Sequence, residues 1–141
     1  MSDFRFEHEL EVRFRDCDPL GHVNNAVYLT YLEAARFAWW GTTFGPDGLR
    51  EYGFILARVE IDYRHAALPG QRLIVRLRVS AIGRSSFTVE YEIVAGTGGE
   101  LVAQARSVQV AYDYELGRSV PLAPVVRTRL EAAMIVPNPN P

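Results

Sequence analysis

The sequence predicts an α+β fold in which a five-stranded antiparallel sheet curls around one long buried helix. Three observations support this prediction: an alternating segment near the start of the chain, a very apolar helix after it, and four further alternating segments. A helix that is apolar on nearly every face must be buried on nearly every face. Curling the sheet around the helix is the economical way to bury it.

The first element is a strand over about residues 6–14. Apolar side chains alternate there with charged ones, which is typical of a half-buried strand. The opposite face carries only arginine and glutamate side chains and is expected to face water. The side chains assigned to the buried face are Phe6, His8, Leu10, Val12 and Phe14.

The second element is a helix over about residues 26–40, roughly 22 Å long. Apolar residues recur there at helical spacing, and further apolar residues fill the other faces. The only charges of the helix, Glu33 and Arg36, are three positions apart, a spacing that allows them to pair. Gly41, followed by Gly45 and Pro46, supplies the expected end of the helix.

Four further strands are predicted after this helix. Turn sequences rich in glycine and proline separate them, and their short connections predict an antiparallel meander. The strands cover about residues 55–63, 73–81, 87–93 and 102–112. Their alternating sets begin with Ile55, Ala57, Val59, Ile61 and Tyr63 and end with Val102, Gln104, Arg106, Val108, Val110 and Tyr112.

The remaining residues complete a single domain. We expect a second helix over about residues 125–134, after a proline, and a flexible tail over residues 137–141, where proline and asparagine alternate. The domain should therefore cover residues 1–136. A chain of 141 residues is about the size of one domain and can bury a substantial core.

Composition limits the classes of function. With 48% hydrophobic residues, 23% charged residues and a net charge of -2, the chain is not a generic polyanion binder, and no nucleic-acid partner is expected. The longest stretch without Asp, Glu, Lys or Arg, residues 19–32, is too short for a membrane span. A single cysteine, Cys17, and a charged N-terminus without signal-peptide character suit the cytoplasm.

The segment that most indicates chemistry is residues 16–25, Asp-Cys-Asp-Pro-Leu-Gly-His-Val-Asn-Asn. It places a carboxylate, Asp18, and an imidazole, His22, on a tight turn directly before the long helix. Asn24 or Asn25 can cap that helix, whose first N–H groups face the same space. A helix start of this kind can polarise a carbonyl group.

With these residues in place, the chain resembles the hotdog fold and, within it, the 4-hydroxybenzoyl-CoA thioesterase-like acyl-CoA thioesterases. The resemblance covers about residues 8–115. It implies hydrolysis of an acyl thioester to a free acid and coenzyme A, with coenzyme A as part of the substrate and with no metal or redox cofactor. The matching motifs are residues 16–25, Tyr28-x-x-Tyr31-Leu32-Glu33-Ala-Ala-Arg36, Ile61-Asp-Tyr63 followed by Pro69-Gly70, and Gly83-Arg84-Ser85-Ser86.

The resemblance assigns the central catalytic role to Asp18, which matches the family's carboxylate two residues before a Leu-Gly step. The carboxylate would attack the thioester carbonyl and form a mixed anhydride, or it would activate a water molecule. A backbone N–H near Asn25 would stabilise the charge that develops on the carbonyl oxygen. The plain structural interpretation is that Asp18 caps the turn.

His22 keeps several roles open. A similar Asp-x-x-x-His-Val-Asn-Asn pattern occurs in plant thioesterases that act on acyl-carrier protein, although those have asparagine where this chain has Leu20. His22 then orients a water, binds substrate, or only forms hydrogen bonds with Asp18 and the turn. Acyl-carrier protein therefore remains an alternative carrier. Cys17 is expected to be a packing residue, because the adjacent carboxylates Asp16 and Asp18 disfavour a thiolate.

The resemblance also implies substrate-binding residues. Tyr28, Tyr31 and Leu32 are core candidates, of which Tyr31 and Leu32 are expected to line an acyl pocket. Glu33 is Arg36's partner, a subunit contact or a polar group near the active site. The turn formed by Arg84, Ser85 and Ser86 resembles the one that meets the nucleotide end of coenzyme A, with Arg58 as a further phosphate ligand. An ordinary solvated hairpin is the alternative for that turn.

The predicted architecture requires more than one copy of the chain. A five-stranded sheet around one helix leaves an open apolar side and unpaired edges, so we expect a homodimer or homotetramer with a shared site. Two other classes of function stay open. One is a hotdog dehydratase or hydratase that moves a C–H proton, and the other is a non-enzymatic acyl-CoA-binding module.

Overall fold

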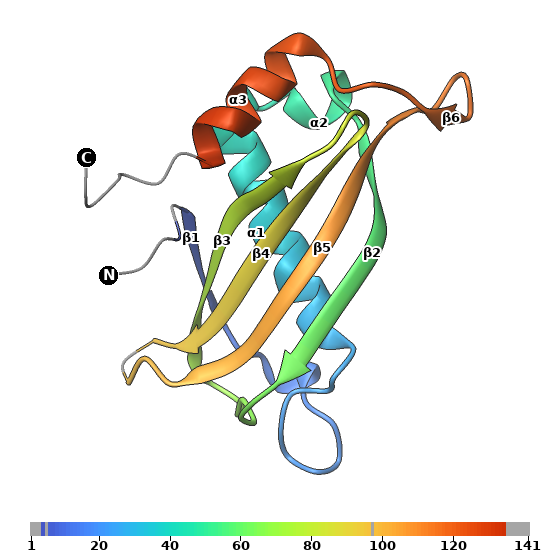
Figure 1. The fold of residues 1–141 in the computed structure, drawn as a ribbon. Coiled ribbons are helices and arrows are strands. Elements are labelled where there is room, and N and C mark those ends of the chain that lie inside the picture. Colours follow the sequence, from blue (N-terminus) through green and yellow to red (C-terminus); the bar gives the residue numbers. More distant parts are fainter. Residues whose placement is uncertain (1–3, 5, 97, 135–141) are drawn as a thin grey trace, which may run out of the picture.

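A long helix lies against the inner face of a curled antiparallel sheet in the computed structural model, which describes residues 4, 6–96 and 98–134 (Figure 1). This arrangement confirms the predicted fold class. The strands are β1 (Phe6–Glu11), β2 (Phe54–Tyr63), β3 (Arg72–Ile82), β4 (Ser86–Ala95), β5 (Leu101–Asp113) and the two-residue β6 (Arg118–Ser119). The helices are the 3-10 turn η1 (Phe14–Asp16), α1 (Val27–Phe44), α2 (Gly48–Glu51) and α3 (Pro124–Met134).

The sheet order is β1-β3-β4-β5-β2, all antiparallel, with β6 added to the end of β5. The predicted meander is therefore wrong for β2, because only β3, β4 and β5 follow one another in space. The physical reason is that β1 occupies the outer edge of β3, where His8 lies opposite Val75. The first strand after α1 must then pair with the free edge of β5. As a result β2 is an edge strand, and residues 64–71 carry the chain back to β3.

The helix α1 is longer than the sequence indicates. Gly41 lies within it, and the helix ends at Gly45, whose φ of 81° is easily adopted only by glycine. The N–H of Gly45 donates to the Gly41 carbonyl and closes the last turn. Its 18 residues correspond to about 27 Å, close to the length of the 10-residue strand β2.

Only one side of α1 is buried, which corrects the expectation of burial on nearly every face. Leu29 is 38% exposed and Phe37 43% exposed, and Glu33 is exposed between them. A sheet of this width reaches around one side of a helix and leaves the other side open in a single chain. The side packed against the sheet consists of Tyr28, Tyr31, Leu32, Ala35, Arg36, Trp39 and Trp40.

The inner face of β5 is also not the predicted one. Ser107 and Gln109 are fully buried beneath α1, whereas Val108 and Val110 lie on the outer face and are only half-buried. The large side chains of α1 fill the space under the sheet, so small or slender side chains suit this strand. A bulge between Leu56 and Arg58 likewise reverses the predicted alternation at the start of β2.

Two smaller corrections concern the N-terminal region and the loops. The first strand ends at Glu11, and Phe14 lies in η1 with 87% of its surface exposed, not on a buried face. The short helix α2 forms between the long helix and β2, a segment for which the sequence predicted no helix or strand. The predicted second helix is confirmed as α3, whereas the tail at 137–141 and the boundary at 136 lie outside the described residues.

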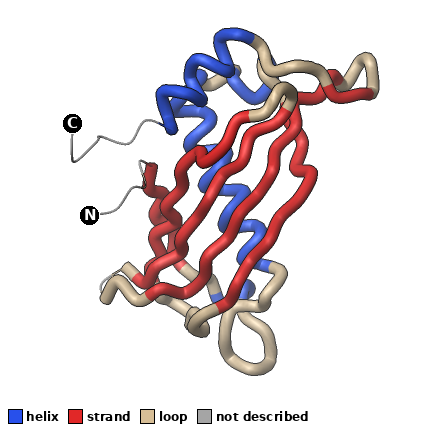
Figure 2. The backbone as a smooth tube through the Cα atoms, in the orientation of Figure 1, coloured by secondary structure: helices blue, strands red, loops and turns tan. Residues whose placement is uncertain are grey.

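The loops gather at the two ends of α1 (Figure 2). The turn that contains Asp18 precedes α1 at one end, beside the end of β2. α2, α3 and the β6 hairpin surround the other end, where α1 finishes and β2 begins (Figure 1). No helix among the described residues is long and apolar enough to cross a membrane.

Candidate active site

The turn before α1 is a small, closed hairpin. A bridge pairs Cys17 with Val23, the Asp18 N–H donates to the His22 carbonyl at 3.0 Å, and the Gly21 N–H donates to the Asp18 carbonyl at 2.9 Å. Gly21 has a φ of 87°, which the tight turn requires. The N–H of Val23 donates to Ala67 and anchors the hairpin to the loop before β3. The backbone around Asp18 is thus held by directional bonds.

The carboxylate of Asp18 is half-buried, and its two oxygens have different surroundings. Oδ1 accepts the Leu20 N–H at 2.9 Å, which is the turn-capping role that the sequence also allows. Oδ2 accepts no hydrogen bond from any residue that the structure describes. Capping and chemistry are therefore compatible, because one oxygen orients the carboxylate and the other is free to meet a substrate.

His22 is half-buried and is linked to Asp18 through the backbone. Its carbonyl accepts the Asp18 N–H, and its Nδ1 lies 3.4 Å from the Val23 carbonyl oxygen. No hydrogen bond joins the two side chains among the described residues. Of the three roles predicted for His22, these contacts match hydrogen bonding with Asp18 and the turn, through the backbone of Asp18. Orientation of a water and binding of substrate stay predictions.

The start of α1 separates the two asparagines. The N-cap residue of α1 is Ala26, without a side-chain cap, so the predicted cap by Asn24 or Asn25 is wrong. Asn24 instead forms the turn before the helix, since its Oδ1 accepts the Ala26 N–H at 2.9 Å and its carbonyl accepts the Val27 N–H. Asn25 is exposed, and its carbonyl accepts the Tyr63 hydroxyl at 2.8 Å. Within the described part of the chain, the Asn25 N–H has no acceptor. It is thus a donor that remains available to a ligand at the helix start.

Asp16 is a structural residue that sequence reasoning passed over in favour of Asp18. It is 2% exposed and accepts the Arg13 N–H at 3.0 Å, the Arg13 guanidinium at 2.9 Å and the Tyr31 hydroxyl at 2.7 Å. Burial opposes its ionisation, but the hydrogen bonds from Arg13 and Tyr31 outweigh burial and lower the pKa of Asp16. The Arg13-x-x-Asp16 spacing in the sequence could have indicated this ion pair.

Cys17 lies between these two carboxylates. Burial and the charges of Asp16 and Asp18 raise the pKa of its thiol, in agreement with a packing role.

The residues predicted to bind substrate divide into buried and exposed ones. Tyr28, Tyr31 and Leu32 lie in the core, and the Tyr31 hydroxyl is engaged by Asp16. Glu33 is exposed on the open side of α1. It does not pair with Arg36, so that prediction is wrong. The reason is that Arg36 points under the sheet, where its Nη1 donates to the Tyr91 hydroxyl.

Arg36 belongs to a buried polar cluster that no motif indicated. Tyr91 and Gln109 both bond to Ser107, which joins the three residues of the sheet beneath the guanidinium. Among the described residues no carboxylate pairs with Arg36, and its Nε has no hydrogen-bond partner. Burial raises the pKa of Tyr91, so its hydroxyl stays protonated. Arg36 thus links the helix to the sheet through a hydrogen bond, and its buried charge has no carboxylate partner among the described residues.

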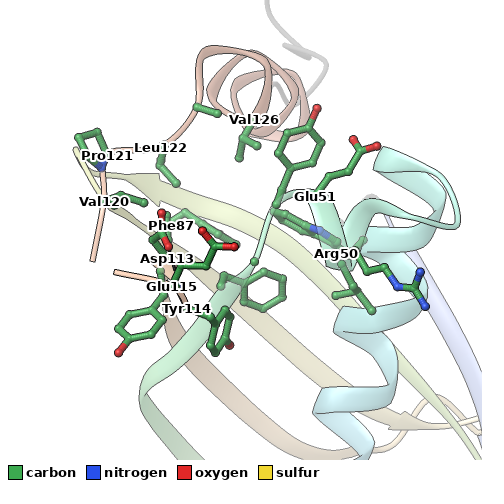
Figure 3. Close-up of a pocket in the computed structure, with 18 residues that line it drawn as sticks. Arg50, Glu51, Phe87, Asp113, Tyr114, Glu115, Val120, Pro121, Leu122 and Val126 are labelled. Atoms are coloured by element: carbon green, nitrogen blue, oxygen red, sulfur yellow. Dashed lines mark hydrogen bonds between the residues drawn. The ribbon is translucent and has the colours of Figure 1, made fainter. Parts of the chain in front are cut away.

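A cavity of about 500 Å³ lies at the opposite end of α1 (Figure 3). Figure 3 shows it between α2, α3 and the hairpin around Asp113, Tyr114 and Glu115. Its walls are mainly aromatic and aliphatic, and charged residues stand at its margin. Sequence reasoning missed it, because its lining is assembled from elements far apart in the chain. Examples are Trp40 of α1, Tyr52 after α2, Phe54 of β2, Phe87 of β4, Ala111 of β5 and Val126 of α3.

The residues predicted to bind coenzyme A do not all lie together. Arg84, Ser85 and Ser86 form the β3–β4 turn at the cavity end of the molecule, where the carbonyl oxygens of Arg84 and Ser85 accept the N–H groups of Leu122 and Ala111. The Arg84 side chain is exposed. Arg58 lies on the outer face of the sheet and pairs with Glu60 at 2.8 Å.

The predicted catalytic and coenzyme A residues of one chain are far apart. β2 runs between the two ends, since Tyr63 contacts Asn25 and Phe54 lines the cavity. Its 10 residues correspond to about 30 Å. The structure therefore separates Asp18 from the turn at 83–86 within a chain. Among the described residues, no group of three or more His, Cys, Asp or Glu side chains is placed to hold a metal ion.

The comparisons with known proteins place this fold in the class of hotdog thioester hydrolases. The thioesterase-like superfamily matches residues 12–130, and the chain belongs to that family. The predictions of a hotdog fold and of a thioester hydrolase are thereby confirmed.

Three relatives illustrate the likeness. A thioesterase of Thermus thermophilus, in a crystal structure with coenzyme A and zinc, is 40% identical with a TM-score of 0.85, covering 97% of this chain and 99% of that one. The long-chain acyl-CoA thioesterase FadM of Escherichia coli is 27% identical over 87% of this chain and 95% of FadM. A 1,4-dihydroxy-2-naphthoyl-CoA hydrolase of Synechococcus elongatus is 26% identical over 86% of this chain and 90% of its own length.

Proposed function

We propose that the protein is an acyl-CoA thioesterase that hydrolyses an acyl thioester to the free acid and coenzyme A. The observation that carries the proposal is the pairing of two available groups at the start of α1. Asp18 has one carboxylate oxygen without a partner, and Asn25 has an N–H without an acceptor among the described residues. Relatives named for acyl-CoA hydrolysis, and one solved with coenzyme A, support this choice of substrate.

The two groups act on one carbonyl. The Asn25 N–H donates to the carbonyl oxygen and stabilises the negative charge that develops there, a contribution that is typically about 3 kcal/mol for one such donor. The Asp18 Oδ2 attacks the carbonyl carbon, the carbon–sulfur bond breaks, and the coenzyme A thiolate leaves and takes up a proton. Water then hydrolyses the mixed anhydride and restores the carboxylate.

General-base catalysis is the second possible course of the same reaction. Asp18 would then take a proton from water, and that water would attack the carbonyl carbon. His22 lies on the same hairpin as Asp18, and we propose that it positions such a water. In the nucleophilic course, water that opens the anhydride at the Asp18 carbonyl carbon leaves solvent oxygen in Asp18, whereas in the general-base course solvent oxygen enters only the acid product. Label found in Asp18 after single-turnover hydrolysis in ¹⁸O-labelled water therefore identifies the nucleophilic course.

We further propose that the active unit is a homodimer or a homotetramer built from dimers. Leu29 and Phe37 expose apolar surface on the open side of α1, and Leu56 and Tyr63 of the edge strand β2 are 43% and 46% exposed. The outer edge of β2 has no strand partner among the described residues. Two copies that pair their β2 edges antiparallel would extend the sheet and cover this surface.

Such a pairing also brings together the predicted catalytic residue and the predicted coenzyme A residues, which are far apart within one chain. It places the turn formed by Arg84, Ser85 and Ser86 of one copy at the same end as Asp18 of the other. Three strand spacings, about 14 Å, separate that turn from the end of the first copy's β2. An extended ligand such as coenzyme A can bridge this distance, with its nucleotide on one copy and its thioester on the other. Arg58 would act only as a more distant contact.

The remaining features of the proposal follow from composition. We propose a cytoplasmic enzyme without a nucleic-acid or membrane partner, consistent with the single cysteine and with the modest negative charge. We also propose that it needs no metal or redox cofactor. Asp18 and the helix start supply the chemistry, and coenzyme A enters only with the substrate.

A thiol-release assay on a panel of acyl-CoAs of different lengths and shapes tests the function. The wild-type chain should release coenzyme A thiol, and Asp18→Asn should bind acyl-CoA without turnover. A change in the substrate's double bond without thiol release would indicate a hydratase. Binding without any reaction would indicate a binding module. Faster thiol release from an acylated acyl-carrier protein than from acyl-CoA would show that acyl-carrier protein is the preferred carrier.

A further inference from the structure

The cavity at the far end of α1 has the properties of a site for an apolar group. Trp40 stacks on Phe87 with 5.6 Å between ring centroids and an interplanar angle of 10°, and it also contacts Phe54 at 4.6 Å. The indole N–H donates to the Gly48 carbonyl, so the ring is fixed and its polar atom is satisfied. A preformed aromatic wall around about 500 Å³ is typical of a small-molecule site.

The cavity also excludes the nucleotide end of coenzyme A. Three carboxylates stand at its margin, Glu51, Asp113 and Glu115, against one guanidinium, Arg50 (Figure 3). Asp113 is held in place because its Oδ1 accepts the N–H groups of Glu115 and Leu116. Phosphates would be repelled by this margin. The chemistry of the cavity therefore suits an uncharged hydrocarbon or aromatic group.

The position of the cavity decides which thioester can use it. Within one chain it lies at the opposite end of β2 from Asn25, and β2 is about 30 Å long. Asp18 of the same chain therefore cannot reach a thioester whose acyl group lies in the cavity. Antiparallel pairing of two β2 edges brings Phe54 of one copy toward Tyr63 of the other. The cavity of one copy then lies at the same end as Asp18 of the other.

We propose that this cavity holds the acyl group of the thioester that Asp18 of a second copy attacks. The inference rests on the proposed function and adds to it the acyl pocket and the chain that supplies it. Each active site then combines the polar end of α1 from one copy with the aromatic end of α1 from the other. The acyl group accepted is apolar, and its size is set by Ala111, Tyr52 and their neighbours.

Two substitutions of opposite effect test the pocket. Ala111→Phe fills the cavity from β5, and Tyr52→Ala enlarges it. Ala111→Phe should lower kcat/KM for the largest acyl-CoA that the wild type hydrolyses by about tenfold or more, while the shortest substrate changes little. Tyr52→Ala should shift the preference toward larger acyl groups. The matched control is Val110→Phe, which adds a ring to the outer face of the same strand.

The outcomes separate the two proposals. If the wild type releases no thiol from any acyl-CoA, the proposed function fails. If the wild type is active and Ala111→Phe has the same acyl preference as Val110→Phe, the pocket assignment fails alone. Thermal melting shows whether Ala111→Phe folds. If it does not, Tyr52→Ala decides, because an unchanged acyl preference of Tyr52→Ala also overturns the pocket assignment.

A mixed dimer tests whether the pocket comes from the second copy. Chains with Asp18→Asn and chains with Ala111→Phe are co-expressed with different affinity tags, and the heterodimer is purified through both. One of its sites has an intact Asp18 and an intact cavity only if the two come from different chains. That site combines Asp18 of the Ala111→Phe chain with the cavity of the Asp18→Asn chain, so the heterodimer should hydrolyse the large acyl-CoA at about half the wild-type rate per dimer. Failure of the heterodimer to exceed the Ala111→Phe homodimer would overturn the shared pocket.

Discussion

The two ends of α1 are built by different kinds of interaction. At the first end, directional hydrogen bonds hold Asp16, Asp18 and Asn24, and they leave a carboxylate oxygen and an N–H unpaired among the described residues. At the second end, stacked rings around Trp40 leave a volume of about 500 Å³. Directional bonds orient individual atoms, whereas packing defines a shape. Catalysis needs the former and recognition of an apolar group needs the latter.

The largest expected effect is at the polar end. Asp18→Asn removes the nucleophile or base but keeps an oxygen that can accept the Leu20 N–H, so the turn should survive. We expect kcat to fall by about 10²-fold or more for every acyl group. Thiol release with circular dichroism as a folding check measures this. Asp47→Asn makes the same chemical change at an exposed site and should keep full activity, and an active Asp18→Asn enzyme would remove Asp18 from its role.

The next largest effect concerns the proposed pairing of two copies, which brings the first end of α1 of one copy to the same side as the second end of α1 of the other. Phe37→Glu places a charge on the exposed apolar side of α1 and should convert the oligomer to a monomer, with loss of about tenfold or more of thiol release. Light scattering after gel filtration measures the mass. Val125→Glu is the matched control, since Val125 is 42% exposed on α3 against 43% for Phe37. A wild-type chain that is monomeric at micromolar concentration would contradict the shared site.

A smaller effect is expected from the carboxylate that supports the polar end. Asp16→Ala should lower the free energy of unfolding by about 2 kcal/mol, because it leaves the Tyr31 hydroxyl and the Arg13 N–H without their acceptor. Denaturant titration measures the loss.

The same variant predicts a pH dependence. The pKa of Asp16 is lowered in the folded chain, so its stabilising contribution is complete above its ordinary value of 3.8 and decreases as the pH falls further. The difference between wild type and Asp16→Ala should therefore shrink below about pH 4. A difference that is constant from pH 7 to pH 3 would contradict the assigned hydrogen bonds.

The smallest effect lies between the ends, and it has the opposite sign. Arg36 is buried without a carboxylate among the described residues, so its desolvation is poorly compensated. Arg36→Met keeps the volume and should leave the free energy of unfolding unchanged or raise it by about 1 kcal/mol. A loss of about 2 kcal/mol or more would show that the bond to Tyr91 outweighs that desolvation. The comparison with Asp16→Ala thus distinguishes a satisfied buried charge from an unsatisfied one.

The candidate site was predictable in part. The hairpin that presents Asp18 is local, since its turn, its glycine and its helix start lie within ten residues of one another. The cavity at the other end is not local, because Trp40, Phe87 and Val126 meet only after the sheet has formed. No periodicity reports such a meeting. The structural role of Asp16, as distinct from the candidate catalytic role of Asp18, also depends on Tyr31 of α1, whose hydroxyl donates to the Asp16 carboxylate.

By itself the sequence determined the fold class, the long strands and helices, the candidate catalytic loop and the family. These depend on short-range patterns, which are periods of two or 3.6 residues and turn residues with fixed backbone preferences. Only the tertiary structure decided three other features. β2 lies at the edge of the sheet beside β5, Ser107 of β5 faces the core, and Arg36 bonds to Tyr91 and not to Glu33. The physical reason is competition for space and partners: β1 already occupies the edge of β3, and the large side chains of α1 already fill the core.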